Sequence, residues 1–205
     1  YHPTGQIKAT WGGQTTPTLR LYDEQERLTE VRTYPDLASG AEPTEATPGH
    51  QYTRWIFDDA TGHLLQKLDH QGKGPTYAYT PGGKLQSRTW ARGVSTTYAY
   101  DTGLLSSIDH SDDTPGLSYA YDELGRVSTV TQGANQWTYA HHATQHQLIN
   151  ETISYANGLT RQIDRTYDAL RRPTSLALRH GPRTENSASY SYDSLGRLST
   201  LSSGA

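Results

Sequence analysis

The sequence predicts an all-β protein built from tandem antiparallel β-hairpins, and three observations support this fold class. The stretch 118–130 returns almost unchanged at 189–201, so the chain carries an internal repeat. Aromatic residues within the unit stand two apart, which places them on one face of a strand. Only 33% of the residues are hydrophobic, and 15 Tyr stand against one Phe. Tyrosine buries its ring while its hydroxyl stays solvated or hydrogen-bonded, so this composition suits an extended sheet better than a thick core.

The second aromatic residue of each unit marks the repeat along the whole chain. These anchors are Tyr1, Tyr22, Phe57, Tyr79, Tyr100, Tyr121, His141, Tyr167 and Tyr192. Most neighbouring anchors lie about 21 residues apart, a period typical of stacked supersecondary units. We therefore expect 1–205 to form a single array of about nine hairpin units without a domain boundary. The widest gap holds a Pro-, Glu- and Thr-rich stretch, which we interpret as a surface loop inserted at about 35–50.

The turn of each hairpin follows the anchor and has the pattern Asp-x-x-Gly. Asp at the first position and Gly at the fourth favour a type I turn, in which Gly takes positive φ. The two best copies define the structural repeat, with residues Tyr119, Tyr121, Asp122, Gly125 and Arg126 in one and Tyr190, Tyr192, Asp193, Gly196 and Arg197 in the other. Glu26 and Arg171 replace the Gly in two copies. Pro173 in a return strand predicts an edge, a bulge or a wide spacing there.

The return strands show a pattern that a regular strand does not explain. Apolar residues stand three apart, as in Leu28 and Val31 or Val127 and Val130. Residues three apart in a regular strand lie on opposite faces of the sheet. Either both faces bury side chains, or a β-bulge intervenes.

Two groups of side chains suggest a metal site, and a turn of the repeat explains each of them better. His141, His142 and His146 match no familiar zinc spacing, and we interpret His141-His142 as a degenerate copy of Tyr-Asp. Asp109, Asp112 and Asp113 lack the spacing of a calcium loop and read as a solvated turn. The sequence therefore predicts no catalytic residue, no metal site and no cofactor, and hence no enzyme. Asn150-Glu-Thr152 is a glycosylation sequon by pattern only.

Charge and hydropathy exclude several kinds of partner. The net charge of −3 gives no basis for nucleic-acid binding. No apolar run approaches the roughly 20 residues of a membrane span. The chain has no Cys, so it holds no disulfide. It also has no Met and therefore no initiating residue, so we interpret it as a fragment of a longer protein. Exposed sheet edges at both ends of such a fragment would allow self-association.

The unit Tyr-x-Tyr-Asp-x-x-Gly-Arg, at 119–126 and again at 190–197, resembles the tyrosine–aspartate (YD) repeat of the RHS family. That family includes Tc toxin B and C components, bacterial RHS toxins and teneurins. The resemblance implies a curved or spiralling sheet that forms part of a β-cage or shell around a C-terminal polypeptide cargo. It also implies a secreted or cell-surface protein that meets its cargo or neighbouring repeats of a longer chain. No segment here matches the family's autoprotease core.

A binding module is the alternative interpretation. Trp11, Trp55, Trp90 and Trp137, together with exposed tyrosines, are residue types that stack on sugars, so glycans or a protein at the cell surface are the alternative partners. Packing of these rings between hairpins is the simpler explanation.

Overall fold

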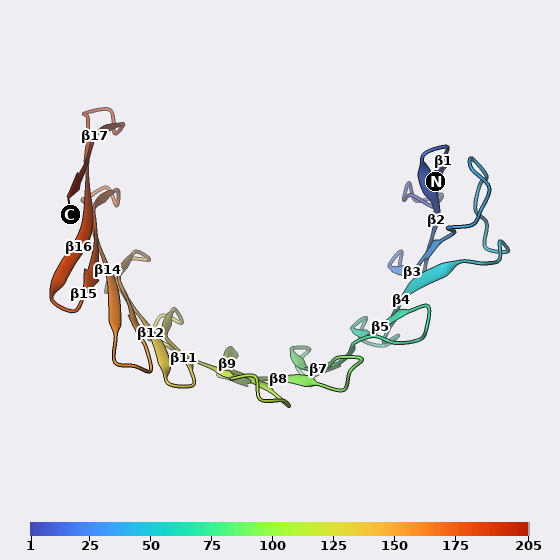
Figure 1. Cartoon of the computed structure of the whole chain (residues 1–205), viewed down its shortest axis with the longest axis horizontal. Coiled ribbons are helices and arrows are strands. Elements are labelled where there is room, and N and C mark those ends of the chain that lie inside the picture. The colour runs from blue at the N-terminus through green and yellow to red at the C-terminus, as the bar shows by residue number, and fades with distance from the viewer. Residues whose placement is uncertain (205) are drawn as a thin grey trace. The chain divides into compact units, whose positions relative to one another are not determined.

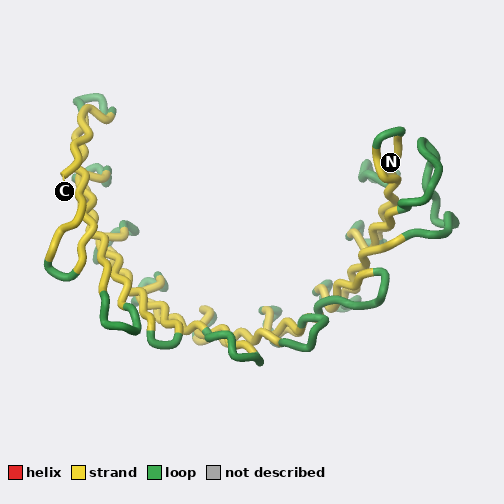
Figure 2. The backbone as a smooth tube through the Cα atoms, viewed as in Figure 1, coloured by secondary structure: helices red, strands yellow, loops and turns green. Residues whose placement is uncertain are grey.

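The structure is a computed structural model that describes residues 1–204, and it consists of strands joined by turns and loops (Figures 1 and 2). No helix occurs in this range, so none is available there that is long and apolar enough to cross a membrane. The predicted all-β class is confirmed. The strands are β1 (Ala9–Gly12), β2 (Thr15–Tyr22), β3 (Leu28–Thr33), β4 (Gln51–Phe57), β5 (Leu64–Asp69), β6 (Thr76–Tyr79), β7 (Leu85–Thr89), β8 (Ser95–Asp101), β9 (Leu104–His110), β10 (Leu117–Tyr121), β11 (Val127–Gln132), β12 (Asn135–His141), β13 (Leu148–Ser154), β14 (Thr160–Tyr167), β15 (Pro173–His180), β16 (Arg183–Tyr192) and β17 (Leu198–Gly204).

The chain divides into two compact units, Tyr1–Thr97 and Tyr98–Ala205. In the first unit, each strand from β1 to β7 pairs antiparallel with the next strand in the sequence. In the second unit, the strands from β9 to β17 pair in the same sequential way. Both units are therefore β-meanders of tandem hairpins. That the whole chain is a single array stays a prediction.

A β-bulge recurs beside the anchor in seven hairpins and explains the three-residue apolar spacing. Tyr121 lies opposite Val127, while Tyr119 lies opposite Val130, because the register shifts by one residue between these pairs. The same shift occurs at Tyr22, Phe57, Tyr79, His141, Tyr167 and Tyr192. A bulge adds one residue to the return strand, so two apolar residues three apart reach the same face. Pro173 lies beside such a bulge, opposite Tyr167.

The registers give the sheet of the second unit two chemically different faces. One face carries the anchors and the apolar residues opposite them, such as Tyr192 opposite Leu198. The other face carries small hydroxyl side chains, for example Ser189 between Ser175 and Ser202. Most side chains on both faces are half-buried or exposed, so each hairpin depends on its neighbours for stability.

The loop between β3 and β4 gives the first unit its most deeply buried side chains. Leu19 of β2 and Tyr34, which follows β3, are each only 1% exposed. The Tyr34 backbone N–H donates to the Pro17 carbonyl (3.0 Å), and its hydroxyl donates to the Thr44 carbonyl (3.0 Å). The loop has no regular secondary structure, and it packs against the sheet through Tyr34 and the buried Pro43.

Candidate functional site

The turn that follows each anchor is held by the aspartate of the YD motif. Oδ1 of Asp122 accepts hydrogen bonds from the backbone N–H groups of Leu124 (3.0 Å) and Arg126 (2.9 Å). Oδ2 of Asp122 accepts from Nε of Arg126 at 2.6 Å. One carboxylate therefore satisfies two turn amides and fixes the arginine that begins the return strand. Equivalent bonds join Asp23 to Arg27, Asp168 to Arg172 and Asp193 to Arg197.

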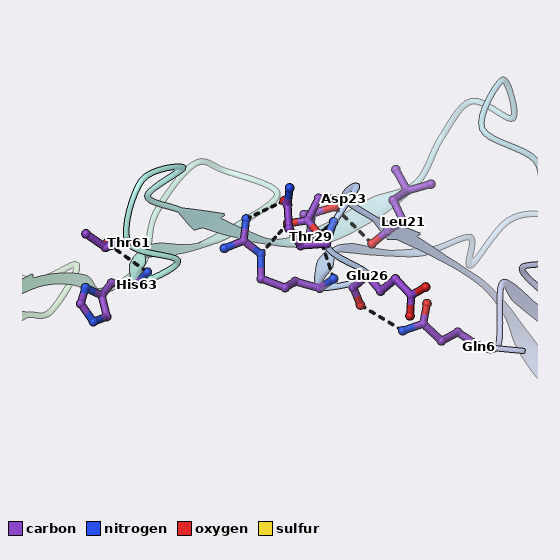
Figure 3. A network of polar contacts seen from close by, with 9 residues as sticks. Gln6, Leu21, Asp23, Glu26, Thr29, Thr61 and His63 are labelled. Carbon is purple, nitrogen blue, oxygen red and sulfur yellow. Dashed lines mark hydrogen bonds and ion pairs between the residues drawn. The ribbon is translucent and has the colours of Figure 1, made fainter. Parts of the chain in front are cut away.

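Figure 3 shows this arrangement around Asp23, the member in the first unit. Gln6, which belongs to the preceding repeat, donates from Nε2 to the Glu26 carbonyl at 3.0 Å. Thr29 is the bulged residue of β3, and its hydroxyl donates to the Leu21 carbonyl at 3.2 Å. The turn is thus bonded both to its own hairpin and to the preceding one.

At the fourth turn position, glycine and two larger residues alike take a positive φ. Gly125 and Gly196 have φ of 74° and 80°, and each N–H donates to the carbonyl of the turn aspartate at 2.9 Å. Glu26 and Arg171 stand at the same position with φ of 63° and 66°. The conformation that the Asp-x-x-Gly pattern predicts therefore persists without glycine. A left-handed conformation costs a residue with a Cβ roughly 1–2 kcal/mol.

In five repeats the anchor hydroxyl bonds the hairpin to the one before it. Tyr121 donates to the Leu105 carbonyl at 2.7 Å, and Tyr167 donates to the Leu148 carbonyl at 3.0 Å. The same bond joins Tyr22 to the Ile7 carbonyl (2.9 Å), Tyr79 to the Leu64 carbonyl (2.9 Å) and Tyr192 to the Pro173 carbonyl (2.8 Å). Leu64, Leu148 and Pro173 each begin a return strand. We call this series of bonds the tyrosine ladder.

His141 takes the place of a tyrosine in the ladder. Its Nε2 lies 3.0 Å from the Val127 carbonyl, so Nε2 is the nitrogen that donates, as a tyrosine hydroxyl does. The interpretation of His141-His142 as a degenerate Tyr-Asp pair thus has a geometric basis. His142 accepts a bond at Nδ1 from the Thr144 backbone N–H (3.3 Å) within its own turn. Among residues 1–204, no three His, Asp or Glu side chains are grouped as a metal site.

In two repeats the arginine at the end of the turn contacts an aromatic ring of the next hairpin. The Arg172 guanidinium lies 4.2 Å from the Tyr192 ring centroid, and Arg27 lies 4.6 Å from the Phe57 ring centroid. His63 occupies the equivalent position in its repeat and stacks on Tyr79, with ring centroids 4.3 Å apart. The two arginine contacts are cation–π interactions, which contribute about 0.5–1 kcal/mol each at exposed sites.

Arg126 bridges to the next repeat differently. Its Nη1 donates to the backbone carbonyls of His142 (3.0 Å) and Gln145 in the following turn. Tyrosine, arginine and turn aspartate therefore form one inter-repeat network.

The turn bonds also change the acidity of the aspartates. The backbone N–H of Arg197, followed by its side chain, lowers the pKa of Asp193 below its ordinary value of 3.8. The backbone N–H of Arg172 lowers the pKa of Asp168 in the same way, against the opposing effect of burial. Hydrogen bonds to these carboxylates stabilise their charged form, which is the form that accepts hydrogen bonds with both oxygens. The network uses them as turn caps.

The other residues that the sequence singled out lie apart from this network. Asp109 accepts from the Ser107 hydroxyl at 2.9 Å. Asn150 lies within β13 and donates to Asp164 Oδ1 at 2.6 Å, so its amide is engaged in the sheet. Trp55 and Trp137 are half-buried, whereas Trp11 and Trp90 are 44% and 39% exposed.

Sequence reasoning missed the acceptors of the tyrosine ladder because they are backbone carbonyls and leave no side-chain signal. It also missed the role of the arginine as partner of the turn aspartate. A signal for that role exists, since Arg follows Asp by four residues in four repeats, at Arg27, Arg126, Arg172 and Arg197.

Comparison with known proteins finds similarity in structure. No family model matches the chain, and no curated protein matches it. A chain in the Tc holotoxin pore of Photorhabdus luminescens, solved with a TccC3 mutant, aligns with a TM-score of 0.69 and 17% sequence identity. That alignment covers 91% of this chain and 10% of the toxin chain, so this chain spans about a tenth of its relative. A crystal structure of TcdB2–TccC3–Cdc42 aligns at 16% identity over 94% of this chain and 14% of that one, with a TM-score of 0.49.

At 17% identity, the holotoxin alignment establishes a common fold. The chain has the fold of the aligned part of that toxin chain, and the resemblance to the RHS/YD-repeat family that its tyrosine–aspartate motifs predicted is confirmed at the level of fold.

Proposed function

We propose that this chain is a non-catalytic structural segment of an RHS-type repeat protein and forms part of a shell that encloses a polypeptide cargo. The tyrosine ladder is the observation that carries this proposal. It places the most characteristic side chain of the motif, the anchor Tyr, on the carbonyl of the preceding hairpin, as in Tyr121 to Leu105. The motif residues bond neighbouring repeats to one another, as the residues that form the wall of a shell would.

The charged groups of the motif support the same role. Asp122 accepts three hydrogen bonds from its own turn, and Arg126 bonds to Asp122 and to the next turn. A general acid or base has to exchange protons with a substrate, but these groups are bonded to the fold itself. The likeness to a Tc holotoxin chain supports the shell as the setting for this wall.

Protease protection of the native protein tests the proposal. An antibody raised against this segment would isolate the protein from producing cells and their medium, and partners would be identified by mass spectrometry. We expect a polypeptide well above 22.7 kDa, together with a co-purifying cargo that resists protease until the wall is denatured. A cargo digested at the same rate before and after denaturation would contradict enclosure. A native protein of 22.7 kDa without cargo would contradict the shell.

A further inference from the structure

Three turns of the second unit expose a leucine at the same position of the repeat. The third residue of the turn is Leu124 between β10 and β11, Leu170 between β14 and β15, and Leu195 between β16 and β17. They are 61%, 72% and 75% exposed. Paired strands flank the turns of Leu124 and Leu170 on both sides, so this exposure does not depend on where the chain ends. A row of large apolar side chains that stay in solvent marks an interaction surface.

The turns of Leu124 and Leu170 lie on one edge of the sheet, with the turn between β12 and β13 midway between them. Alternate turns of an antiparallel meander return to the same edge, and the strands from β10 to β15 pair in sequence. The middle turn is two strands from each of the others, which is about 10 Å. We call these three turns, 122–125, 142–147 and 168–171, the leucine edge.

The two ends of the leucine edge carry opposite charges. Glu123 is exposed at one end, and Arg171 is exposed at the other. No ion pair within 4.0 Å joins either side chain to another residue of 1–204. The middle turn contains no Asp, Glu, Lys or Arg, and it exposes the small side chains of Ala143 and Thr144.

Arg171 is also held in a strained backbone conformation. It occupies the fourth turn position with φ of 66°, where Gly125 and Gly196 take φ of 74° and 80° without a Cβ. An arginine at this position costs free energy, and its guanidinium forms no ion pair in the described part of the chain that would offset the cost. Strain of this kind points to a role for the side chain outside its own fold.

The leucine edge is complementary to itself. A two-fold axis through the β12–β13 turn brings the acidic end of one copy against the basic end of another, at both ends of the contact. The same rotation brings Leu124 against Leu170, because both lie at the same number of strands from the axis. The small side chains of the middle turn allow close approach at the axis. A uniformly acidic or uniformly basic partner would pair with one end and repel the other.

We infer that the leucine edge binds the same edge of a second copy of this chain in antiparallel orientation. Leu124 of each copy packs against Leu170 of the other. Glu123 of each copy pairs with Arg171 of the other. This contact is separate from the tyrosine ladder and does not rest on the shell proposal.

Sedimentation equilibrium of the purified protein tests this inference, and the first unit supplies variants that suit the turn. Its β2–β3 turn has Gln25 at the leucine position and Glu26 with φ of 63° at the strained position. Leu170→Gln and Arg171→Glu therefore introduce residues that this turn type already holds. We expect the wild type to dimerise and each variant to weaken the dimer about tenfold or more, because each substitution acts twice in a two-fold contact.

Charge reversal and a matched control separate this contact from a loss of folding. Adding Glu123→Arg to Arg171→Glu should restore the dimer, since the exchanged charges meet again across the axis. Leu159→Gln, at a 45% exposed leucine beside the β13–β14 turn on the opposite edge, should leave the dimer unchanged.

Cysteine cross-linking tests the orientation, because the chain has no Cys of its own. Thr144→Cys lies at the axis and should form a disulfide-linked dimer under mild oxidation. Glu123→Cys should not link to itself, since its two copies lie about 19 Å apart, but it should link to chains that carry Arg171→Cys.

The inference is overturned if the wild type is monomeric, if Leu170→Gln dimerises as the wild type does, or if the charge exchange fails to restore the dimer. Association through the outermost strands would survive Leu170→Gln and would therefore count against the leucine edge. Linking of Glu123→Cys to itself would contradict the antiparallel orientation. Each of these results leaves the shell proposal intact.

Discussion

Removing one hydroxyl from the tyrosine ladder and adding one where it is missing would measure what the ladder contributes. Tyr121→Phe deletes the 2.7 Å bond to the Leu105 carbonyl and leaves the ring in place. A net hydrogen bond contributes about 0.5–1.5 kcal/mol. Because this bond is partly buried, we expect a loss of about 1 kcal/mol in the free energy of unfolding of the second unit.

Phe57→Tyr is the reciprocal change. Phe57 stands at an anchor position, opposite Leu64, where the repeat elsewhere has Tyr. By analogy with Tyr79, which bonds to the Leu64 carbonyl, a hydroxyl at residue 57 would reach the carbonyl of Leu28, the first residue of β3. We expect a gain of about 0.5–1 kcal/mol in the first unit.

Chemical denaturation followed by circular dichroism would measure both changes, and amide hydrogen exchange would assign them to a unit. Exchange is the sharper assay because repeat arrays do not unfold in one cooperative step. Tyr155→Phe is the matched control, since the exposed Tyr155 makes no side-chain hydrogen bond within residues 1–204 and should show no change. If Tyr121→Phe behaves like the control and Phe57→Tyr brings no gain, the hydroxyl bonds do not hold the repeats together.

Three further predictions concern the turns and the histidine of the ladder. Gly125→Ala should destabilise by roughly 1 kcal/mol because φ is 74°, whereas Arg171→Gly should stabilise by a similar amount; equal melting temperatures would refute the strain argument. Asp193 should make stability fall in acid, because Arg197 lowers its folded pKa: its contribution is complete above the unfolded value near 3.8 and is lost as pH falls through the folded pKa. Denaturation midpoints from pH 7 downward should therefore fall less for Asp193→Asn, and parallel curves would exclude this role. His141→Tyr should preserve stability while His141→Phe lowers it by about 1 kcal/mol; equal effects on thermal unfolding would show that His141 is no ladder member.

The hairpins were predictable from sequence because their signals are local. An alternating aromatic pair and the Asp-x-x-Gly turn lie within a few residues, so the anchors from Tyr22 to Tyr192 fall at or near the ends of strands. The apolar residues three apart, such as Val127 and Val130, narrowed the geometry to two alternatives. Only the register of β10 against β11 shows that a β-bulge, rather than burial on both faces of a regular strand, explains this spacing.

The inter-repeat bonds were not predictable because their acceptors are backbone atoms in another hairpin. The sequence shows that Tyr121 recurs, but the Leu105 carbonyl has no sequence signature. The packing of the loop at 35–50 was not predictable from the sequence for a related reason. Its composition indicates a surface loop, but the burial of Pro43 depends on contacts with residues distant in sequence.

Electron microscopy of the purified native protein would test the structural role of this chain most directly. If these repeats form part of a wall, the particles should be hollow, with antibody to this segment bound on the wall and additional density enclosed within. Solid particles, or open ribbons with no enclosed volume, would contradict the shell and leave a repeat module that acts through its surface.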